Sequence, residues 1–425
     1  MDDVMDISSV FLFSRDENVI TLSSRITLSS KQLDDARILK NQLLNEIKSR
    51  LKSEIGIDVK HWLQGSYKNH TLVCPVRKND DFDIDAGIYL LCNAPKIGLS
   101  AANVRKKLRD VLQSVVTNNH NLKLEDSKKN CERLSYAQQF HIDLPVYYFD
   151  ETNQECKLAT IDSGWTDSDP KVLQDYFNKL TSNLEPYELA RLRRVIKYIK
   201  SWVLLKWKGA KRKIPSLAVT FYVAENYQVK DNDHDAFILM AASFAAYFLK
   251  NDKFICNKNG NDLLGYNTDD LQYAREMLSA LKKDCDLMLN ENNNYKKLVI
   301  WSNLFEYLFP PLLHRLNDQE IKIILPKHFP IPQLLVQLTH NKKQISIIKN
   351  YKVQAYKGDK LLLSVLNKDD YPMNTIILWR VRNQGIEASE AYDLGHEYLK
   401  KSGEITHDEN CAYEGTHYVE CMILD

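Results

Sequence analysis

Two aspartates separated by one residue have the spacing in this sequence that points most directly to chemistry. Asp83 and Asp85 lie in the apolar run DFDIDAGIYLL. Side chains on a strand alternate between faces, so an extended run places both carboxylates on one face, about 7 Å apart. Two like charges at that range raise each other's pKa unless a cation compensates. Mg²⁺ typically binds one or two carboxylates plus substrate phosphates. We therefore predict a divalent metal site, against the alternative of two solvated residues at a strand end.

Three further segments contain residues suited to a triphosphate and its metal ions. Gly65-Ser66 should open a short helix whose backbone amides and hydroxyl can bind phosphate oxygens. Asp143 places a third carboxylate inside the apolar run FHIDLPVYY, and Lys200 adds a cation in the helical segment RRVIKYIKSW. Plainer interpretations stay open beside these. Ser66 could be only a helix cap, Lys200 a surface lysine, and Asp143 a solvated residue.

The elements that must position these residues form a mixed α+β protein. Ser29 and Gln32 make an S-x-x-Q capping box in front of a long helix that runs to about residue 55, with an apolar residue at every fourth position. Asp169 and Pro170 have the residue types of a helix start. Periodicity predicts further helices over 103–116, 185–208, 216–227, 236–250, 269–289 and 297–309.

The sequence pattern changes from helical periodicity to short β-rich runs in the last quarter of the chain. The runs ISIIKNYKVQAY, KLLLSVL, TIILWRVRN and HYVECMIL are short, β-rich and separated by turn residues. Trp379 and Arg382 in the third run could contact a ligand, or they could be only core and salt-bridge residues of that domain. A linker is marked by Pro326, Pro330 and Pro332. We predict three parts, a core with a long helix over 1–170, a helical lobe over 171–330 and a β-rich domain over 345–425.

Composition narrows the classes of function. The chain of 425 residues is 44% hydrophobic and 27% charged, as in ordinary soluble proteins, and its net charge of +1 predicts no strong binding to nucleic acid. The longest apolar run, over 236–249, is too short to span a bilayer, so no membrane association is expected. The start MDDVMD has no signal pattern and the eight cysteines show no C-x-x-C, which together predict a cytoplasmic location.

The ordered set of motifs resembles a known family. The segments WLQGSYKNHT, DFDIDAGIYL, FHIDLPVYY, SDPKVLQDYFNKL, RRVIKYIKSW and IPSLAVTF are similar to those of nucleotidyltransferases of the polymerase-beta type. Within that superfamily they look most like the bacterial dinucleotide cyclases, the CD-NTases of the SMODS family in CBASS anti-phage defence, which are relatives of cyclic GMP–AMP synthase. The resemblance covers about residues 30–320. The later segments ILWRVRNQGIEA and YEGTHYVECMI are similar to the AGS-C sensor-like domain.

The resemblance implies a fold and a set of site residues. It implies a polymerase-beta-like core with a long spine helix, a helical lobe and a small β-rich C-terminal domain. Two Mg²⁺ ions, with Mn²⁺ as a substitute, would be held by Asp83, Asp85 and Asp143. Nucleotide and phosphate contacts would come from Gly65, Ser66, Arg133, Lys200 and Ser216. For Ser216 a simple helix cap after Pro215 remains the alternative.

The resemblance also implies an activity and partners. The enzyme would join nucleoside triphosphates, ATP and GTP above all, into a cyclic di- or trinucleotide messenger with release of pyrophosphate. The product would activate an effector protein, and the C-terminal domain could bind a small ligand or a phage-derived activator. Alternatives are a template-independent synthase of linear oligonucleotides, an enzyme that modifies RNA or protein, and a degenerate module that only senses nucleotides. The presence of all three aspartates argues against the last.

Overall fold

A computed structural model of the chain describes residues 6–78, 80–137, 139–209, 211–256, 260–312, 316, 330–341, 343–349, 352–372, 375–400 and 405–424. The chain divides into two compact units. One, here the core unit, comprises Ile26–Pro75 and Asp80–Cys285, and the other, here the tail unit, comprises Met1–Arg25, Val76–Asn79 and Asp286–Asp425. The three-part division expected from the sequence stays a prediction beside this two-part description.

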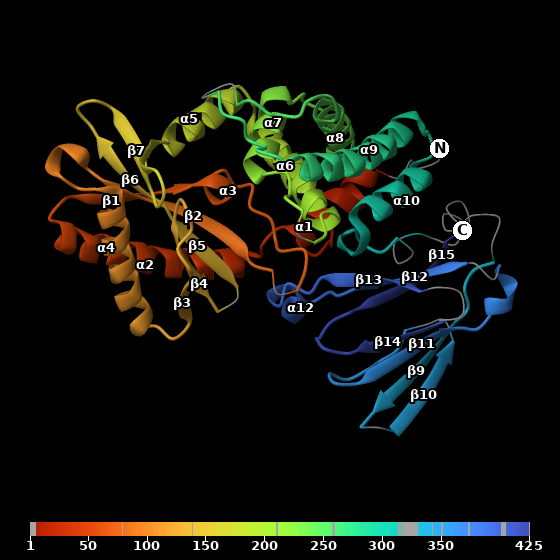
Figure 1. The fold of residues 1–425 in the computed structure, drawn as a ribbon. Helices are drawn as coiled ribbons and strands as arrows, with labels where there is room; N and C mark the ends of the chain where they lie inside the picture. Colours follow the sequence, from red (N-terminus) through yellow and green to blue (C-terminus); the bar gives the residue numbers. More distant parts are fainter. Residues whose placement is uncertain are drawn as a thin grey trace. The chain divides into compact units, whose positions relative to one another are not determined.

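The core unit contains an eight-stranded sheet, which lies at the left of Figure 1. Its order is β3-β4-β5-β2-β6-β7-β8, with β1 paired to β2. The strands are β1 Val59–Gln64, β2 Phe82–Leu90, β3 Leu122–Leu124, β4 Glu132–Tyr136, β5 Phe140–Leu144, β6 Val146–Asp150, β7 Glu155–Thr160 and β8 Gly164–Asp167. Strand β2 is central and runs parallel to β5 in its first half and to β6 in its second, because Pro145 separates those two neighbours.

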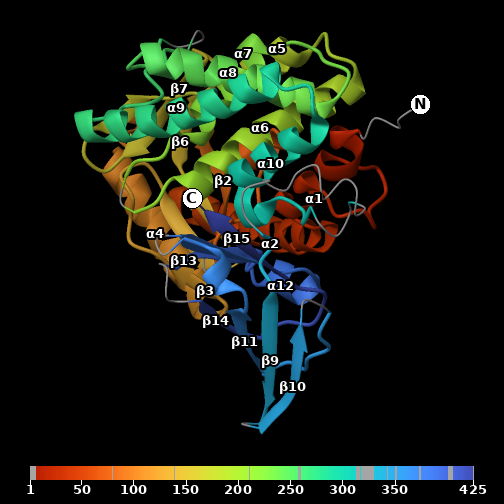
Figure 2. The ribbon, with the colours of Figure 1, turned by 90° about the vertical axis from the view of Figure 1, so that its right-hand side faces the viewer.

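Two long helices of the core unit, α2 (Ser30–Ile55) and α4 (Ala101–Thr117), pack against each other and against strands of this sheet (Figures 1 and 2). The predicted capping box of α2 is confirmed, since Ser29 Oγ accepts from Gln32 N at 3.2 Å and Gln32 Oε1 accepts from Ser29 N at 2.9 Å. The predicted apolar stripe buries Leu43, Ile47 and Leu51. Helix α2 therefore packs its apolar stripe into the interior of the core unit.

The rest of the core unit is helical, as the periodicity predicts. Its helices are α3 Gly65–Lys68, α5 Pro170–Thr181, α6 Pro186–Lys206, α7 Ser216–Asn226, α8 Asp233–Lys250 and α9 Thr268–Asn290, the last of which continues into the tail unit. Asp169 caps α5 as expected, because its side chain accepts from the backbone of Lys171 and Val172. In the described part of the chain, no helix combines the length and apolar character that crossing a membrane requires.

Two small sheets make up most of the tail unit (Figures 1 and 2). One has the order β10-β9-β11-β14 and the other β13-β12-β15. The strands are β9 Leu334–His340, β10 Lys343–Lys349, β11 Lys360–Val365, β12 Ile376–Arg382, β13 Gly395–Lys400, β14 Thr406–Asn410 and β15 Tyr418–Leu424. The predicted run over 345–356 is a strand only in its first part, and Pro326 of the predicted linker lies outside the described residues. Trp379 is fully buried between the sheets and Arg382 pairs with Glu420, in agreement with the interpretation as core and salt-bridge residues.

Short helices complete the tail unit, and one buried arginine joins its separate segments. The helical elements are η1 Ser8–Leu12, α1 Leu22–Ile26, α10 Asn294–Phe305, η3 Glu306–Leu308, η4 Lys368–Asp370 and α12 Ile386–Glu390, and the core unit contains η2 Pro95–Ile97. The Arg25 guanidinium donates to the backbone carbonyls of Tyr307, Leu308, Asn383 and Leu394. The start of the chain is thus tied into the same unit as its end.

Candidate active site

The pairing of β2 with β5 brings the three predicted aspartates together. In this parallel register Asp85 lies opposite Asp143, and Asp83 lies opposite His141. Side chains two residues apart on a strand share a face, so Asp83, Asp85, His141 and Asp143 all project from one face of the sheet. The structure therefore places the third aspartate beside the pair, at the center of the sheet.

Arg133 lies between two of these carboxylates. It is the partner of Asp143 in the β4–β5 register. Its Nε donates to Asp143 Oδ1 at 2.5 Å, and its Nη2 donates to Asp143 Oδ2 at 2.7 Å and to Asp83 Oδ1 at 2.9 Å. Burial alone would raise the pKa of Asp143, but the Arg133 guanidinium outweighs that effect and lowers it. The contact of Arg133 with nucleotide, expected from the resemblance, stays a prediction.

Asp85 has the opposite electrostatic environment. Within the residues that the structure describes, no group donates a hydrogen bond to its carboxylate or forms an ion pair with it. Burial, followed by repulsion from Asp83 and Asp143, raises the pKa of Asp85 to about 7. A cation would remove this repulsion, and three carboxylates are an oxygen ligand set of the kind that Mg²⁺ and Mn²⁺ prefer. The residues present therefore fit divalent metal ions.

His141 is a further neighbour of the aspartates. It is packed, with 7% of its side chain exposed, and its Nδ1 lies 2.8 Å from Asp81 Oδ2. Its other ring nitrogen contacts Asp83. His141, Asp83 and Asp143 offer ligand atoms that all lie within 4.8 Å of one another. The signal was available, since His141 and Asp143 have the same two-residue spacing as the aspartate pair.

Gly65 lies against the Asp85 carboxylate. Gln64, at the end of β1, is the register partner of Asp85, so the chain turns into α3 directly beside that residue. The backbone of Gly65 has φ +62°, and a Cβ atom at this position would lie 2.2 Å from Asp85 Oδ2. A left-handed conformation and a close approach both require glycine here. The glycine therefore allows the start of α3 to approach the aspartates.

The three predicted phosphate-binding polar side chains meet one another. Lys200 Nζ donates to Ser66 Oγ at 3.1 Å, and Ser66 Oγ lies 3.1 Å from Ser216 Oγ. Thr71 holds the same ammonium through its hydroxyl at 3.0 Å and its carbonyl at 3.3 Å. These contacts connect α3, α6 and α7 beside the sheet.

The plainer interpretations of these three residues are wrong. Lys200 is 5% exposed, so it is no surface lysine. Ser66 and Ser216 each lie inside the helix they were thought to cap, because the N-cap positions belong to Gln64 and Pro215. Burial, and then the charge of Lys197, lowers the pKa of Lys200 to about 7. A buried ammonium held by hydroxyls is suited to an anionic ligand, which would favour its charged form.

A pocket of about 310 Å³ opens next to these groups, within the range of small-molecule sites. It is lined by Gln64, Gly65, Ser66, Asn69, Asp85, Pro170, Leu173, Gln174, Ser216, Leu217, Thr220 and Phe221. Four of these were predicted site residues, and apart from Ser216 the lining contributed by α5 and α7 was missed. Helical spacing could have identified Thr220, which lies one turn after Ser216.

Comparison with known proteins agrees with this geometry. Residues 59–147 match the model of the cyclic GMP-AMP synthase DncV-like nucleotidyltransferase domain, and residues 327–425 match the adenylyl/guanylyl and SMODS C-terminal sensor domain. A cyclic GMP-AMP synthase of Escherichia albertii is 34% identical over 417 residues, which cover 97% of this chain and 92% of the relative. A cyclic GMP-AMP synthase of Vibrio cholerae is 26% identical, over 49% of this chain and 56% of the relative.

Solved structures show the same fold. The Vibrio cholerae DncV cyclic AMP-GMP synthase in complex with the linear intermediate pppA(3′,5′)pG superposes with a TM-score of 0.56 at 18% identity, over 70% of this chain and 95% of that one. Escherichia coli DncV in its 3′-deoxy GTP bound form gives 0.57 at 17% identity, over 72% and 99%. Together with the match along nearly the whole Escherichia albertii enzyme, the two domain matches show that this chain belongs to the family of bacterial cyclic GMP-AMP synthases, nucleotidyltransferases with a DncV-like catalytic domain and a C-terminal sensor domain.

Proposed function

We propose that this protein joins two nucleoside triphosphates into a cyclic dinucleotide and releases pyrophosphate. The observation that carries the proposal is the position of Asp143 directly opposite Asp85, with Asp83 on the same face, at the border of a pocket that also contains Gly65 and Ser66. The names of the relatives favour ATP and GTP as substrates. Phosphoryl transfer requires positioning and neutralisation of charge, and this site has groups for both.

The acidic end of the site would hold the metal ions. Asp83, Asp85 and Asp143 would bind two Mg²⁺ ions, or Mn²⁺, which when bound neutralise the triphosphate and favour the ionised form of the attacking hydroxyl. Asp85 is the aspartate that lines the pocket, so it would face both the metal ions and the substrate phosphates. Arg133 would keep the Asp83 and Asp143 carboxylates in place through its hydrogen bonds to both.

The polar groups beside the aspartates would bind the phosphates. Ser66 and Ser216 line the pocket with their hydroxyls 3.1 Å apart. Lys200 donates a hydrogen bond to Ser66 and would contribute a positive charge to the binding of the same ligand. A triphosphate bound here would also keep Lys200 protonated, because a nearby anion favours the charged form of an amine.

The remaining pocket wall would hold the base and sugar of a nucleotide. Leu173, Leu217 and Phe221 supply apolar surface, whereas Gln174 and Thr220 supply hydrogen-bonding groups. An aromatic ring next to a few polar side chains is a common environment for a nucleobase. This wall belongs to α5 and α7, so base selection would depend on these two helices.

The biological setting follows from the family and forms part of the proposal. The cyclic product would act in the cytoplasm as a messenger in CBASS anti-phage defence and would activate an effector protein. The C-terminal domain, by its match to a sensor domain, would bind a small ligand or a phage-derived activator that controls synthesis.

Product analysis tests the proposed reaction. The full-length protein is incubated with Mg²⁺ and each pair of isotopically labelled nucleoside triphosphates, then treated with phosphatase and analysed by mass spectrometry. A cyclic dinucleotide has no terminal phosphate and survives the phosphatase, so a resistant product from ATP and GTP supports the proposal. A ladder of phosphatase-sensitive products would instead identify a linear oligonucleotide synthase. Nucleotide binding without any turnover would identify a sensing module.

A further inference from the structure

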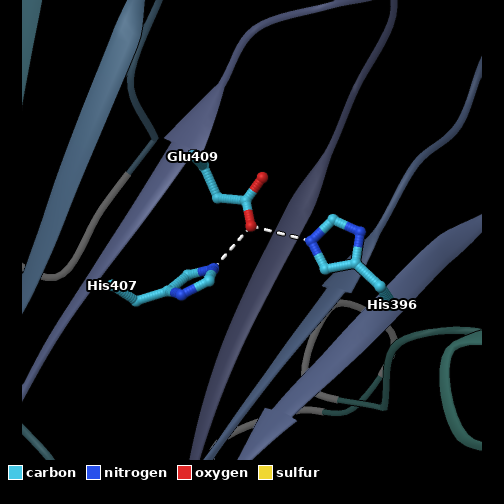
Figure 3. Close-up of side chains that lie close together, drawn as sticks. All are labelled: His396, His407 and Glu409. Carbon is cyan, nitrogen blue, oxygen red and sulfur yellow. Dashed lines mark hydrogen bonds and ion pairs between the residues drawn. The ribbon is translucent and has the colours of Figure 1, made fainter.

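A second group of side chains with ligand character belongs to the tail unit. His396 belongs to β13, and His407 and Glu409 belong to β14 (Figure 3). Each of these strands is the last in its sheet, so the group lies where the edge strands of the two small sheets approach each other. His407 and Glu409 are two residues apart and therefore project from the same face of β14.

Both histidines contact the same oxygen atom of Glu409. Glu409 Oε1 lies 2.7 Å from His396 Nε2 and 2.5 Å from His407 Nε2, as the dashed lines of Figure 3 show. The ligand atoms of all three residues lie within 4.8 Å of one another. Two imidazoles and the carboxylate that they both contact together offer three of the four ligands of a tetrahedral metal site.

Neighbouring aromatic rings fix the orientation of the two imidazoles. The buried Trp379 ring stacks on His407, with the centroids 5.7 Å apart and the planes 20° from parallel. Tyr398 packs against both histidines, at 4.9 Å from His396 and 4.8 Å from His407. Ligand side chains held by such surrounding contacts bind metal with less loss of conformational freedom.

The three side chains differ in their exposure to solvent, and His396 is the most exposed. The side chain of His407 is 5% exposed and that of Glu409 is 15% exposed, whereas His396 is 32% exposed. The first two residues are thus held in the protein interior and the third lies at the surface. An ion could enter from the His396 side, and its remaining coordination position would face that opening.

The donor set selects the type of ion. Magnesium and calcium take oxygen ligands, whereas two imidazole nitrogens and one carboxylate oxygen suit zinc. Zinc binds nitrogen and oxygen at about 2.0–2.2 Å in a tetrahedral arrangement, which places ligand atoms roughly 3.3 Å apart. The two nitrogen–oxygen separations of 2.7 and 2.5 Å would have to grow by less than about 1 Å, a change within the reach of small side-chain rotations.

We propose that His396, His407 and Glu409 form a zinc site that clips together the edge strands of the two C-terminal sheets. Bound zinc would lie between the two imidazole nitrogens and the carboxylate oxygen, in place of their present direct contacts. Three protein ligands leave a fourth position for water or for a small ligand with an oxygen, nitrogen or sulfur donor. Because the ligands come from both sheets, bound zinc would stabilise the folded tail unit by binding the native state alone.

Zinc titration of the full-length protein tests this proposal. The aspartate site is first removed by Asp83→Asn and Asp85→Asn, so that it cannot contribute zinc binding, and the chelator-treated protein is titrated by calorimetry. We expect one zinc per chain, with affinity at least about tenfold lower after His396→Gln or Glu409→Gln. His340→Gln is the matched control, because His340 is also a half-exposed histidine of the tail unit that is hydrogen bonded to one carboxylate, Asp359.

A second measurement keeps the result independent of folding defects. Circular dichroism reports whether each variant is folded, and His396→Gln changes the most exposed member of the group. Zinc should raise the melting temperature of the parent protein and of His340→Gln, but not that of folded His396→Gln or Glu409→Gln. Equal zinc stoichiometry and affinity in the parent and in all three variants would overturn the proposal, as would the absence of zinc binding in the parent.

Discussion

Asp85 on β2 lies directly opposite Asp143 on β5, in a parallel register that also sets Asp83 opposite His141. The carboxylate cluster is therefore a consequence of strand pairing between segments far apart in the chain. A shift of the register by one residue would move Asp143 to the other face of the sheet. The antiparallel pairing of Arg133 with Asp143 adds a second constraint on the same strand.

Replacing Asp143 by asparagine should abolish nucleotidyl transfer while the fold is kept. The amide has nearly the same shape but no negative charge, so it would weaken metal binding and leave Arg133 without its main partner. We expect the rate of pyrophosphate release to fall by at least about 100-fold. Asp126→Asn, at an exposed position of the same unit, is the control and should keep its activity. Comparable rates for both variants would exclude a metal-binding role for Asp143.

Substitution of Gly65 by alanine separates backbone strain from the close approach to Asp85. Gly65 and Gly56 both have positive φ, +62° and +75°, but only the Cβ at position 65 would clash with Asp85 Oδ2. Each alanine should cost about 1–2 kcal/mol in unfolding free energy from backbone strain. Gly65→Ala should in addition lower the turnover rate by roughly 100-fold, because it displaces the carboxylate. Equal turnover in Gly65→Ala and Gly56→Ala would show that the contact has no part in the reaction.

Replacing Arg133 should show whether its main role is to hold the Asp83 and Asp143 carboxylates or to bind the nucleotide. Arg133→Gln takes a positive charge away from Asp83 and Asp143, so Mg²⁺ should bind the nucleotide-free protein more tightly than it binds wild type. Calorimetric titration with Mg²⁺ measures this change, and Arg37→Gln, at an exposed position of α2, serves as the control. If Mg²⁺ affinity is unchanged and only the KM for nucleotide rises, the main contact of Arg133 in the enzyme is with substrate.

The lowered pKa of Lys200 should make the free energy of unfolding of the protein depend on pH. Its folded-state pKa of about 7 lies well below the value near 10.4 of an unfolded lysine, so the folded protein binds fewer protons between these pH values. The unfolding free energy contributed by this residue must then rise with pH across that window. Relative to Lys200→Met, wild type should gain about 1–2 kcal/mol between pH 7 and 8.5.

Urea unfolding at the two pH values measures this difference. The exposed Lys208 supplies the control, because Lys208→Met should follow wild type at both pH values. The prediction fails if wild type and Lys200→Met change in parallel. A neutral Lys200 in the free enzyme would also mean that triphosphate binding takes up a proton, which links this measurement to the proposed phosphate contact.

A buried ion pair supports the strand that carries Arg133. Arg105 on α4 donates to Glu132 at 2.8 Å and 2.5 Å, and both side chains are nearly inaccessible. Glu132→Gln would leave the buried guanidinium without a counter-charge, so we expect a loss of roughly 3–5 kcal/mol in chemical denaturation. Asp58→Asn breaks the exposed pair with Lys52 and should leave the free energy of unfolding almost unchanged. A small effect in both variants would contradict the structural role assigned to Glu132.

Local signals in the sequence predicted those parts of the fold that local physics determines. Capping residues and apolar periodicity predicted α2, α5 and α6 because a helix is stabilised by contacts within a few residues. Strands β13 and β14 were missed because their sequences, GHEYLK and THDEN, are polar edge strands without an alternating apolar pattern.

The candidate site also combines features that local sequence predicts with features that depend on distant segments. Two-residue spacing predicted that Asp83 and Asp85 share a face. Asp143 was noticed as a carboxylate inside an apolar run, and the family resemblance assigned it to the same metal site. The burial of Lys200 could not be predicted, because it depends on Ser66 and Thr71 from a distant segment. The pocket wall of α5 and α7 was missed for the same reason, since helix packing and not local sequence determines which residues face the aspartates.

The ratio of pyrophosphate to product tests the central proposal most directly. Closing a ring of two nucleotides releases two pyrophosphates per product molecule, whereas a linear dinucleotide releases one and keeps a triphosphate end. With ATP, GTP and Mg²⁺, we predict that wild type releases two pyrophosphates per dinucleotide formed. Asp85→Asn should release no pyrophosphate and form no dinucleotide. One pyrophosphate per dinucleotide, or an unchanged yield from Asp85→Asn, would contradict cyclic dinucleotide synthesis at the Asp83, Asp85 and Asp143 site.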